Sequence, residues 1–397
     1  MHTDPLTGLE AAARGLYLHF PYCLRRCPYC DFAIRIQHDI PHARYATAAL
    51  RELELRLTEA PEWDGRPLDS LYIGGGTPSL WEPEELGRVL DGVRKRLPLA
   101  PGAEVSLEAN PEVADRARLV AYHGLGVNRL SIGLQSFEAS TLRTLGRAHE
   151  PDDGARAIEA ARSAGFDNVS VDLIIGVPGQ TVAAAVEDAR RAASLGPDHV
   201  SAYVLTVERQ HLGAETAFSK QVRSGALRLP EDATVVEMVD GVTAALAEAG
   251  LPRYEISSYA RPGKHSRHNA LYWTGGESLA LGVGAVGFRH TGEDRGVRTT
   301  AVRSTPRWME AVDSGRLPDA EREELGRAEL YAERLLLGLR LRSGLDLRAL
   351  WVASGVPPRN AVVEKLTEDG FLEPYQGRVR LTDRGAHLHA EVTARLL

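Results

Sequence analysis

Cysteine is scarce in this sequence: only three occur among 397 residues, and all fall within eight consecutive positions. They are Cys23, Cys27 and Cys30. An odd number of cysteines leaves one thiol over after intramolecular pairing, which argues against a secreted fold stapled by disulfides. Clustered thiols that stay reduced usually bind a metal or take part in chemistry. The clustered cysteines therefore indicate a metal-binding or catalytic site.

Long hydrophobic runs and an excess of basic residues are also missing. No stretch approaches the roughly 20 apolar residues that span a bilayer. Residues 1–14 lack the cationic start and apolar run of a signal peptide, so we expect a cytoplasmic protein without a transmembrane segment. The 47 Lys and Arg against 54 Asp and Glu give a net charge of −7. This charge argues against a broad nucleic-acid surface, and no nucleic acid is expected as a partner.

Short apolar runs alternate with amphipathic segments between residues 16 and 206. The runs start about 25 to 40 residues apart, a spacing typical of βα units with parallel strands. Six units in succession favour a barrel or partial barrel over a doubly wound sheet. The runs are 16–20, 71–73, 105–107, 130–134, 169–175 and 200–205. Helices are predicted between them at 45–57, 83–97, 115–123 and 182–195.

The regular spacing stops beyond residue 210. After a helix predicted at 233–248, three segments appear irregular or strand-like and one appears to be a connector: 253–259, 265–273, 280–288 and 295–306. A further helix at 361–369 and a hairpin strand at 378–381 resemble a winged-helix unit. The predicted domains are an N-terminal extension (1–15), a core barrel (16–245), an extension with connector (246–310) and a C-terminal domain (311–397).

Glycines and polar residues gather at the ends of successive predicted strands. In α/β barrels, the carboxyl ends of the strands build the active site. Each of these residues alone could be an ordinary turn or cap residue. Their coincidence after successive strands predicts a functional site beside the cysteines. They are Gly75, Gly76, Thr77, Glu108, Gln135 and Asp172.

The cysteines directly follow the first predicted strand, with three residues between Cys23 and Cys27 and two between Cys27 and Cys30. Three thiolates on one loop select zinc or an iron–sulfur cluster. Zinc needs a fourth ligand, which His19 or His38 could supply, but zinc sites favour a second cysteine pair and none exists. A [4Fe–4S] cluster takes one ligand per iron, and three cysteines leave one iron open. The pattern favours the cluster.

The residues around the cysteines, LYLHFPYC at 16–23 and CDF at 30–32, resemble the signature of the radical S-adenosylmethionine (radical SAM) superfamily. The resemblance covers nearly the whole chain and implies an α/β fold, a partial (β/α)6 TIM-like barrel with a smaller helical, winged-helix-like C-terminal domain. It also implies a [4Fe–4S] cluster whose open iron chelates S-adenosylmethionine, which one electron cleaves to methionine and a 5′-deoxyadenosyl radical. Later segments resemble the HemN/HemW branch: 74–78, 108–111, 131–137, 146–147, 172–181 and 201–208.

This resemblance gives roles to the strand-end residues. Gly75, Gly76 and Thr77 would let the backbone approach the methionine amino group closely. Glu108 would accept hydrogen bonds from ribose hydroxyls or the ammonium, and a bonded cation would lower its pKa. Arg147 would pair with a carboxylate, the alternative being an ordinary surface arginine. Further contacts to S-adenosylmethionine are implied for Gln135, Asp172 and two tyrosines that could equally be packing residues, Tyr17 and Tyr29.

Two features divide the HemN/HemW branch. The HemN pattern has another cysteine shortly after the third, whereas here Asp31 and Phe32 follow and no further cysteine exists. Residues 268–273, HNALYW, resemble the HNxxYW motif of HemW-type haem chaperones, and YEISSY at 254–259 matches that group. Imidazole is a good axial ligand for haem iron, and aromatic faces suit a porphyrin. The haem-binding residues implied, with His265 as a competitor, are His268, Asn269, Tyr272 and Trp273.

The resemblance therefore implies a HemW-type haem chaperone with a [4Fe–4S] cluster, S-adenosylmethionine and haem as cargo. Its expected partners are haem, haem-accepting proteins and an electron donor for the cluster, and a homodimer is left open. One alternative is a catalytic radical SAM enzyme, related to oxygen-independent coproporphyrinogen III oxidase or to HemN-like methyltransferases. Another is nucleic-acid binding through the C-terminal domain, which rests on fold analogy alone. The net charge of −7 argues against it, although the arginine-rich segment 334–342 leaves it open. No catalytic residue is assigned.

Overall fold

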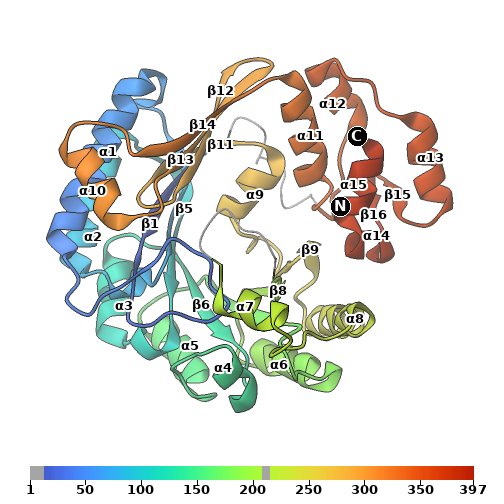
Figure 1. Cartoon of the computed structure of the whole chain (residues 1–397), viewed down its shortest axis with the longest axis horizontal. Coiled ribbons are helices and arrows are strands. Elements are labelled where there is room, and N and C mark those ends of the chain that lie inside the picture. Colours follow the sequence, from blue (N-terminus) through green and yellow to red (C-terminus); the bar gives the residue numbers. More distant parts are fainter. Residues whose placement is uncertain (1–12, 208–214) are drawn as a thin grey trace.

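The computed structural model describes residues 13–207 and 215–397. Its main feature is one curved sheet of 12 strands (Figure 1). The order across the sheet is β14 (Asp319–Leu325), β13 (Arg295–Ala301), β12 (Val286–Gly292), β11 (Glu277–Leu281), β1 (Arg14–Phe20), β4 (Leu68–Gly75), β5 (Leu99–Ala109), β6 (Arg129–Gln135), β7 (Val169–Ile175), β8 (His199–Val204), β10 (Ser258–Ala260) and β9 (Arg253–Glu255).

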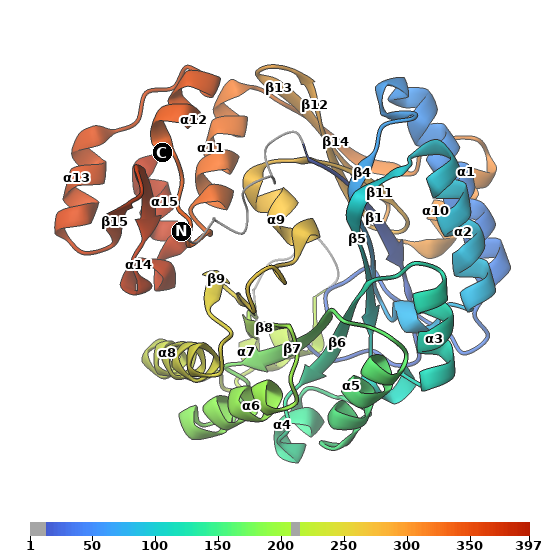
Figure 2. The ribbon, with the colours of Figure 1, turned by 180° about the vertical axis from the view of Figure 1, so that it is seen from behind.

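The predicted α/β fold with a partial barrel is confirmed. The six predicted strands, β1 and β4 to β8, are neighbours in chain order, and every pair among them is parallel. Parallel neighbours need crossover connections, which here run along the outer face of the sheet (Figures 1 and 2). The crossover helices are α1 (His42–Glu59), α2 (Pro83–Arg96), α3 (Arg116–Gly124), α4 (Ala139–Thr144), α5 (Asp153–Ser163) and α6 (Val182–Ser194).

The parallel strands are flanked by elements from later in the chain. On one side β11 pairs in parallel with β1 and continues into the antiparallel strands β12, β13 and β14. On the other side β10 and β9 follow β8 in antiparallel pairing. The sheet therefore stays open between β14 and β9. Three further helices belong to this later part of the chain: α7 (Ala217–Arg223), α8 (Asp232–Glu248) and α10 (Thr305–Asp313).

The large hydrophobic core lies between the sheet and its outer helices. Leu16, Leu18 and Phe20 alternate along β1 and are fully buried, as expected for strand side chains that point to one face. The ring of Phe20 stacks on Trp81 at a centroid distance of 4.8 Å. This packing fixes the carboxyl end of β1, where the cysteine loop begins, beside the carboxyl end of β4.

The C-terminal unit has a hydrophobic core of its own, which includes Leu335, Leu366, Leu381 and Leu396. The expected helix at 361–369 and the hairpin are confirmed. The domain boundaries stay a prediction, and β14, beyond the predicted boundary at residue 310, pairs with β13 in the large sheet. The unit consists of α11 (Arg327–Gly338), α12 (Leu347–Ser354), α13 (Asn360–Glu368), β15 (Leu372–Tyr375), β16 (Arg378–Leu381), α14 (Asp383–His387) and α15 (His389–Leu396).

Two segments differ from the sequence prediction. Residues 265–273, expected to be irregular or strand-like, contain helix α9 (Arg267–Thr274), which begins after Ser266, whose hydroxyl accepts the Asn269 N–H, and ends at Gly275 in the left-handed conformation. Residues 295–306, expected as a connector, form β13 and the start of α10. Few apolar residues mark β13, because it lies in the antiparallel flank, where one face can remain in solvent.

Candidate functional site

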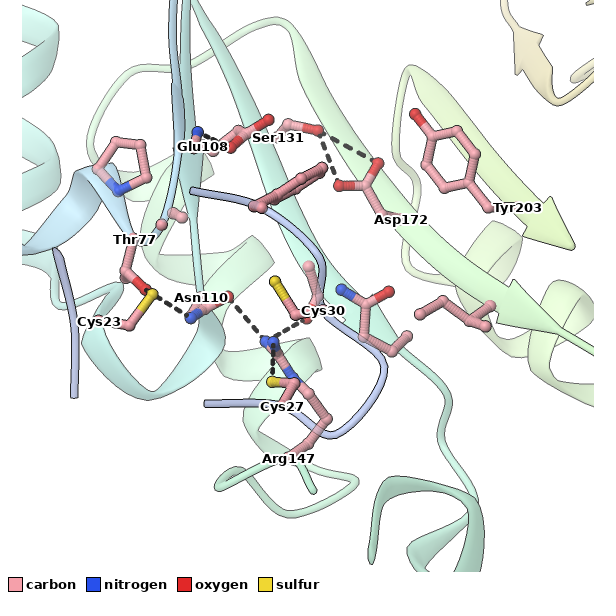
Figure 3. A pocket seen from close by; sticks show the side chains of 18 of the residues that line it. Cys23, Cys27, Cys30, Thr77, Glu108, Asn110, Ser131, Arg147, Asp172 and Tyr203 are labelled. Carbon is pink, nitrogen blue, oxygen red and sulfur yellow. Dashed lines mark hydrogen bonds between the residues drawn. The ribbon is translucent and has the colours of Figure 1, made fainter. Parts of the chain in front are cut away.

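The carboxyl ends of the parallel strands surround a cavity of about 610 Å³, here called the first cavity (Figure 3). The sequence analysis places the site at this end of the sheet. Most of the predicted residues line this cavity, and they come from the cysteine loop and from the ends of β4, β5, β6 and β7. They are Cys23, Cys27, Tyr29, Cys30, Gly75, Gly76, Thr77, Glu108, Gln135, Arg147, Asp172 and Asn269.

The cysteine loop is held at both ends by backbone hydrogen bonds. Short strands β2 (Tyr22–Cys23) and β3 (Arg35–Ile36) pair in parallel and close it. Within the loop, the Cys30 N–H donates to the Cys27 carbonyl at 3.2 Å. All three thiols are free of disulfides. Burial raises the pKa of Cys23 to about 11 and also raises the pKa of Cys30, so thiolates at these positions need a metal to stabilise them.

A chain of hydrogen bonds connects two of the cysteines across the cavity wall (Figure 3). The Thr77 hydroxyl donates to Cys23 Sγ at 3.5 Å, and Asn110 Nδ2 donates to Thr77 Oγ1 at 3.2 Å. Arg147 Nη2 donates to Asn110 Oδ1 at 2.7 Å, and Arg147 Nη1 lies 3.9 Å from Cys27 Sγ. Arg147 is thus half-buried in the cavity wall. Hydrogen bonds to cluster-ligating sulfurs tune the reduction potential of iron–sulfur sites.

The donor set fits an iron–sulfur cluster. Among residues 13–207 and 215–397, no group of three His, Cys, Asp or Glu side chains is arranged to hold a single metal ion. The fit therefore rests on the three soft thiols of one loop, all in the wall of one cavity, with one thiolate available for each of three irons. Arg147 Nε is buried beside them with no hydrogen-bond partner among the described residues.

The two glycines after β4 are needed by the fold itself. Gly75 has a φ of +118°, and a Cβ there would lie 2.6 Å from the His19 ring. A Cβ on Gly76 would lie 2.7 Å from the Tyr22 carbonyl oxygen. The Gly76 N–H donates to the Phe20 carbonyl at 2.7 Å, which ties β4 to the start of the cysteine loop. Close backbone approach at this point requires glycine whatever ligand the cavity takes.

Two buried carboxyl groups face the first cavity. Glu108 accepts hydrogen bonds from the Tyr72 hydroxyl at 2.8 Å and the Gly75 N–H at 2.9 Å. Ser131 Oγ lies 3.3 Å from both carboxylate oxygens of Asp172. Burial raises the pKa of Glu108 to about 7 and that of Asp172 to about 6. A cation bonded to Glu108 would have to overcome this upward shift before it lowered the pKa as expected.

Several residues of this wall that alternate along the strands are not among the site residues predicted from the sequence. Side chains two residues apart on a strand point to the same face, so Gln135 predicts Ser131 on β6. Asp172 is paired with Ser201 across β7 and β8, and Tyr203 follows at the next inward position. The alternation of side chains along each strand is the sequence signal that indicates these positions. All three residues line the first cavity, as do the missed Tyr72 and Asn110.

The remaining predicted residues lie away from the first cavity. Tyr17 and Tyr272 line a second cavity of about 390 Å³. His268 is buried, and its Nδ1 lies 2.9 Å from the Ser70 hydroxyl and its Nε2 lies 2.9 Å from the Tyr272 hydroxyl. Burial lowers the pKa of His268 to about 3, so the ring is neutral. Trp273 lies in neither wall and packs under the Arg340 guanidinium at 4.3 Å. The haem-binding set stays a prediction.

Comparison with known families matches this arrangement. A family model of the radical SAM superfamily matches residues 17–192, and the HemN C-terminal domain matches residues 325–388. The parallel sheet with three loop thiols at its strand ends is therefore the core of a radical SAM protein. A solved structure titled as coproporphyrinogen III oxidase (HemN) from Escherichia coli shares the fold, with a TM-score of 0.80 and 21% identity over 98% of this chain and 90% of that chain.

Curated relatives identify the family more closely. The heme chaperone HemW of Mycobacterium tuberculosis (strain H37Rv) is 38% identical over 386 residues, which cover 96% of this chain and 94% of the relative. The heme chaperone HemW of Escherichia coli K12 is 38% identical over 310 residues and 78% of each chain. The chain belongs to the HemW family. Among the residues that the structure describes, no helix has the length and apolar character to cross a membrane.

Proposed function

We propose that this chain is a haem chaperone that holds a [4Fe–4S] cluster and S-adenosylmethionine and passes haem to acceptor proteins. The observation that carries the proposal is the extent of the similarity, which covers 96% of this chain and 94% of a relative named heme chaperone HemW. Both the barrel and the C-terminal unit lie within that match. We further propose a cytoplasmic location and an electron donor for the cluster as a partner.

Cys23, Cys27 and Cys30 would hold the cluster, since they are the only cysteines of the chain and share one cavity wall. The bound cluster would supply one electron and an iron with a free coordination position. Arg147 and Thr77 would stabilise the negative charge on the thiolates through the hydrogen bonds that they already make to sulfur.

S-adenosylmethionine would occupy the rest of the first cavity, whose volume is in the range of small-molecule sites. Glu108 and Asp172 would accept hydrogen bonds from its hydroxyl or ammonium groups. Gly75 and Gly76 would present backbone groups to it, and Tyr29, Gln135 and Arg147 would line the same space. Tyr17 would act from behind this wall, because its ring stacks on the Tyr72 ring at 6.1 Å.

The second candidate function is a catalytic radical SAM enzyme of porphyrin metabolism. The observation that favours it is the pair of buried carboxyl groups in the first cavity, because pKa values of about 7 and about 6 suit proton transfer at neutral pH. Against it stands the absence of a cysteine beyond Cys30. The HemN pattern has a cysteine in that region.

The two functions are separated by one pair of assays on protein reconstituted anaerobically with iron and sulfide. Haem is titrated while the Soret band is followed, and 5′-deoxyadenosine is measured after reduction with coproporphyrinogen III present. Stoichiometric haem binding without oxidation of coproporphyrinogen is expected. Oxidation of coproporphyrinogen by a protein that binds no haem would overturn the chaperone function. A Cys27→Ala variant is the matched control for cluster-dependent signals.

A further inference from the structure

The second cavity is bounded by α11 on one side and by β11 and β12 on the other, with Tyr17 and Tyr272 in its wall. Apolar side chains such as Val286, Phe288 and Leu337 share the rest of the wall with charged and polar ones. Its volume of about 390 Å³ is within the range of small-molecule sites. A wall that combines apolar side chains with charged groups suits a flat hydrophobic ligand that carries charged groups at its edge.

Three arginines reach this cavity, and two of them are already engaged. Arg298 forms ion pairs with Glu323 at 3.3 Å and with Glu333 at 2.5 Å. Arg303 donates a hydrogen bond to the Asp31 carbonyl. Arg334 forms no ion pair or hydrogen bond with any residue in 13–207 or 215–397. It is therefore the arginine of this wall that has neither an ion pair nor a hydrogen bond among the described residues.

The Arg334 guanidinium packs closely against Gly275 at the end of α9. Gly275 ends α9 with a φ of +73°, and a Cβ there would lie only 1.7 Å from Arg334 Nη1. The guanidinium from α11 thus occupies the space that any larger residue at 275 would fill. Burial lowers the pKa of Arg334. A half-buried cation without an acidic partner is costly, and a bound anion would offset that cost.

One histidine side chain from β12 also lies in the wall of the second cavity. His290 lines the second cavity, and its ring meets the Phe288 ring edge-on at 4.9 Å. Within the described parts of the chain its ring nitrogens have no hydrogen-bond partner. This distinguishes it from His19 in the same wall, whose two nitrogens contact the Tyr17 hydroxyl and the Ala33 carbonyl. An imidazole whose ring nitrogens are not engaged by neighbouring residues can serve as a ligand for haem iron.

We propose that the second cavity is the cargo site, where haem lies against Phe288 with one propionate on Arg334 and His290 as the ligand of its iron. The inference rests on the proposed function. It also gives the HNxxYW resemblance a physical meaning. Tyr272 contributes to the cavity wall, and His268 is a positioning residue behind it, through the hydrogen bond between His268 Nε2 and the Tyr272 hydroxyl.

The test compares three probes on the full-length, cluster-loaded protein: haem, haem dimethyl ester and iron-free protoporphyrin. Arg334→Gln is expected to weaken haem binding at least about tenfold, the effect of losing a charge-assisted hydrogen bond. It should leave the affinity for the dimethyl ester, which has no carboxylate, unchanged. The matched control is Arg348→Gln, which removes an exposed arginine of α12.

The iron ligand is tested with His290→Ala. This variant is expected to shift the Soret maximum and weaken haem binding about tenfold, while iron-free protoporphyrin binds as to the wild type. Val286→Trp tests whether haem occupies the second cavity without changing a charged group or an iron ligand. Val286 is 44% exposed, so a larger ring can block the cavity and weaken all three probes. Val120→Trp on α3, where Val120 is 47% exposed, is its control.

The two levels of the proposal fail in different ways. If the wild type binds haem stoichiometrically and Arg334→Gln, His290→Ala and Val286→Trp all keep its affinity and spectrum, the second cavity is not the cargo site and the chaperone function stands. If the wild type binds no haem, the proposed function itself is overturned. Equal weakening of haem and its dimethyl ester by Arg334→Gln would overturn the propionate contact.

Discussion

At the scale of single residues, burial rather than pairing sets the chemistry of Glu108. It accepts hydrogen bonds from Tyr72 and Gly75, which lower its pKa, and the nearby Asp172 raises it. Burial outweighs them and places the pKa at about 7, above the ordinary value of 4.5. Between these two pH values the folded chain holds a proton that the unfolded chain releases. The carboxyl group therefore favours folding below pH 4.5, and this contribution is lost as the pH rises to 7.

Glu108→Gln should remove this pH dependence. Relative to the variant, the free energy of unfolding of the wild type is expected to fall by about 3 kcal/mol as the pH rises from 4.5 to 7.5. Urea unfolding at a series of pH values measures the difference, and other titrating groups cancel between the two proteins. If the free energies of unfolding of the two proteins changed with pH in the same way, the prediction would be wrong.

Arg147 should control the reduction potential of the bound cluster. Arg147→Met removes a positive charge and a donor from Cys27 Sγ, so the reduced cluster loses stabilisation and its potential becomes more negative. A loss of about 1.4 kcal/mol corresponds to about 60 mV for one electron. A redox titration of the reconstituted protein measures the shift. Arg143→Met, an exposed arginine of α4, should leave the potential in place.

His268 provides a residue-scale test of the two haem interpretations. Because its nitrogens contact Ser70 and Tyr272, His268→Ala removes a hydrogen-bond partner from both hydroxyls. Tyr272 keeps Ser278 as a partner, so we expect a total cost of about 1–3 kcal/mol. We expect lower stability and weaker haem binding with an unchanged Soret maximum. A changed maximum in a folded variant would instead identify His268 as the iron ligand, as the sequence motif implies.

At the scale of elements, the sequence predicts what is periodic and local. The strand–helix units up to β8 follow from apolar runs at regular spacing, and the site follows from the polar residues that end them. Helix α9 is difficult to predict because it is short, although Ser266 and Gly275 are ordinary start and stop signals. The pairing of β11 with β1 could not be predicted, since nothing local in Glu277–Leu281 specifies a partner so far away in the chain.

The end of α9 offers an element-scale prediction with a matched control. Gly275→Ala introduces strain at φ +73° and a clash with Arg334, whereas Gly263→Ala introduces the strain alone, because at φ +78° nothing lies within 4 Å. Both should lose about 1 kcal/mol of stability. Only Gly275→Ala is expected to weaken haem binding as well, which a haem titration on both variants measures. Equal haem affinities of the two variants would mean that the close packing of Arg334 against Gly275 plays no part in haem binding.

At the scale of the whole molecule, several charged contacts that differ in burial join the C-terminal unit to the barrel. Arg340, just after α11, pairs with Glu255 of β9 at 3.0 Å, and Glu255 is 2% exposed. Asp383 pairs with Arg253 and Arg342 at 2.5 and 3.2 Å, and it is 68% exposed. The sequence could indicate two units, but such contacts between distant residues carry no local signal.

Glu255→Gln should loosen this connection much more than Asp383→Asn. Breaking a buried pair leaves an uncompensated charge and costs about 3 kcal/mol or more, whereas exposed pairs contribute about 1 kcal/mol or less. Hydrogen exchange of α11 measures the loosening directly. If the backbone amides of α11 exchange at equal rates in the two variants, the buried pair does not hold the C-terminal unit in place.

Phe32 belongs to the walls of both cavities and lies two residues after Cys30 on the cysteine loop. The two cavities therefore share one side chain, which ligands in both of them could contact. A ligand that shifts this ring in one cavity changes the affinity of the other cavity. Linkage requires the effect to be equal in the reverse direction. If haem and S-adenosylmethionine occupy the two cavities as proposed, Phe32 is the side chain through which cargo loading and cofactor binding would be coupled.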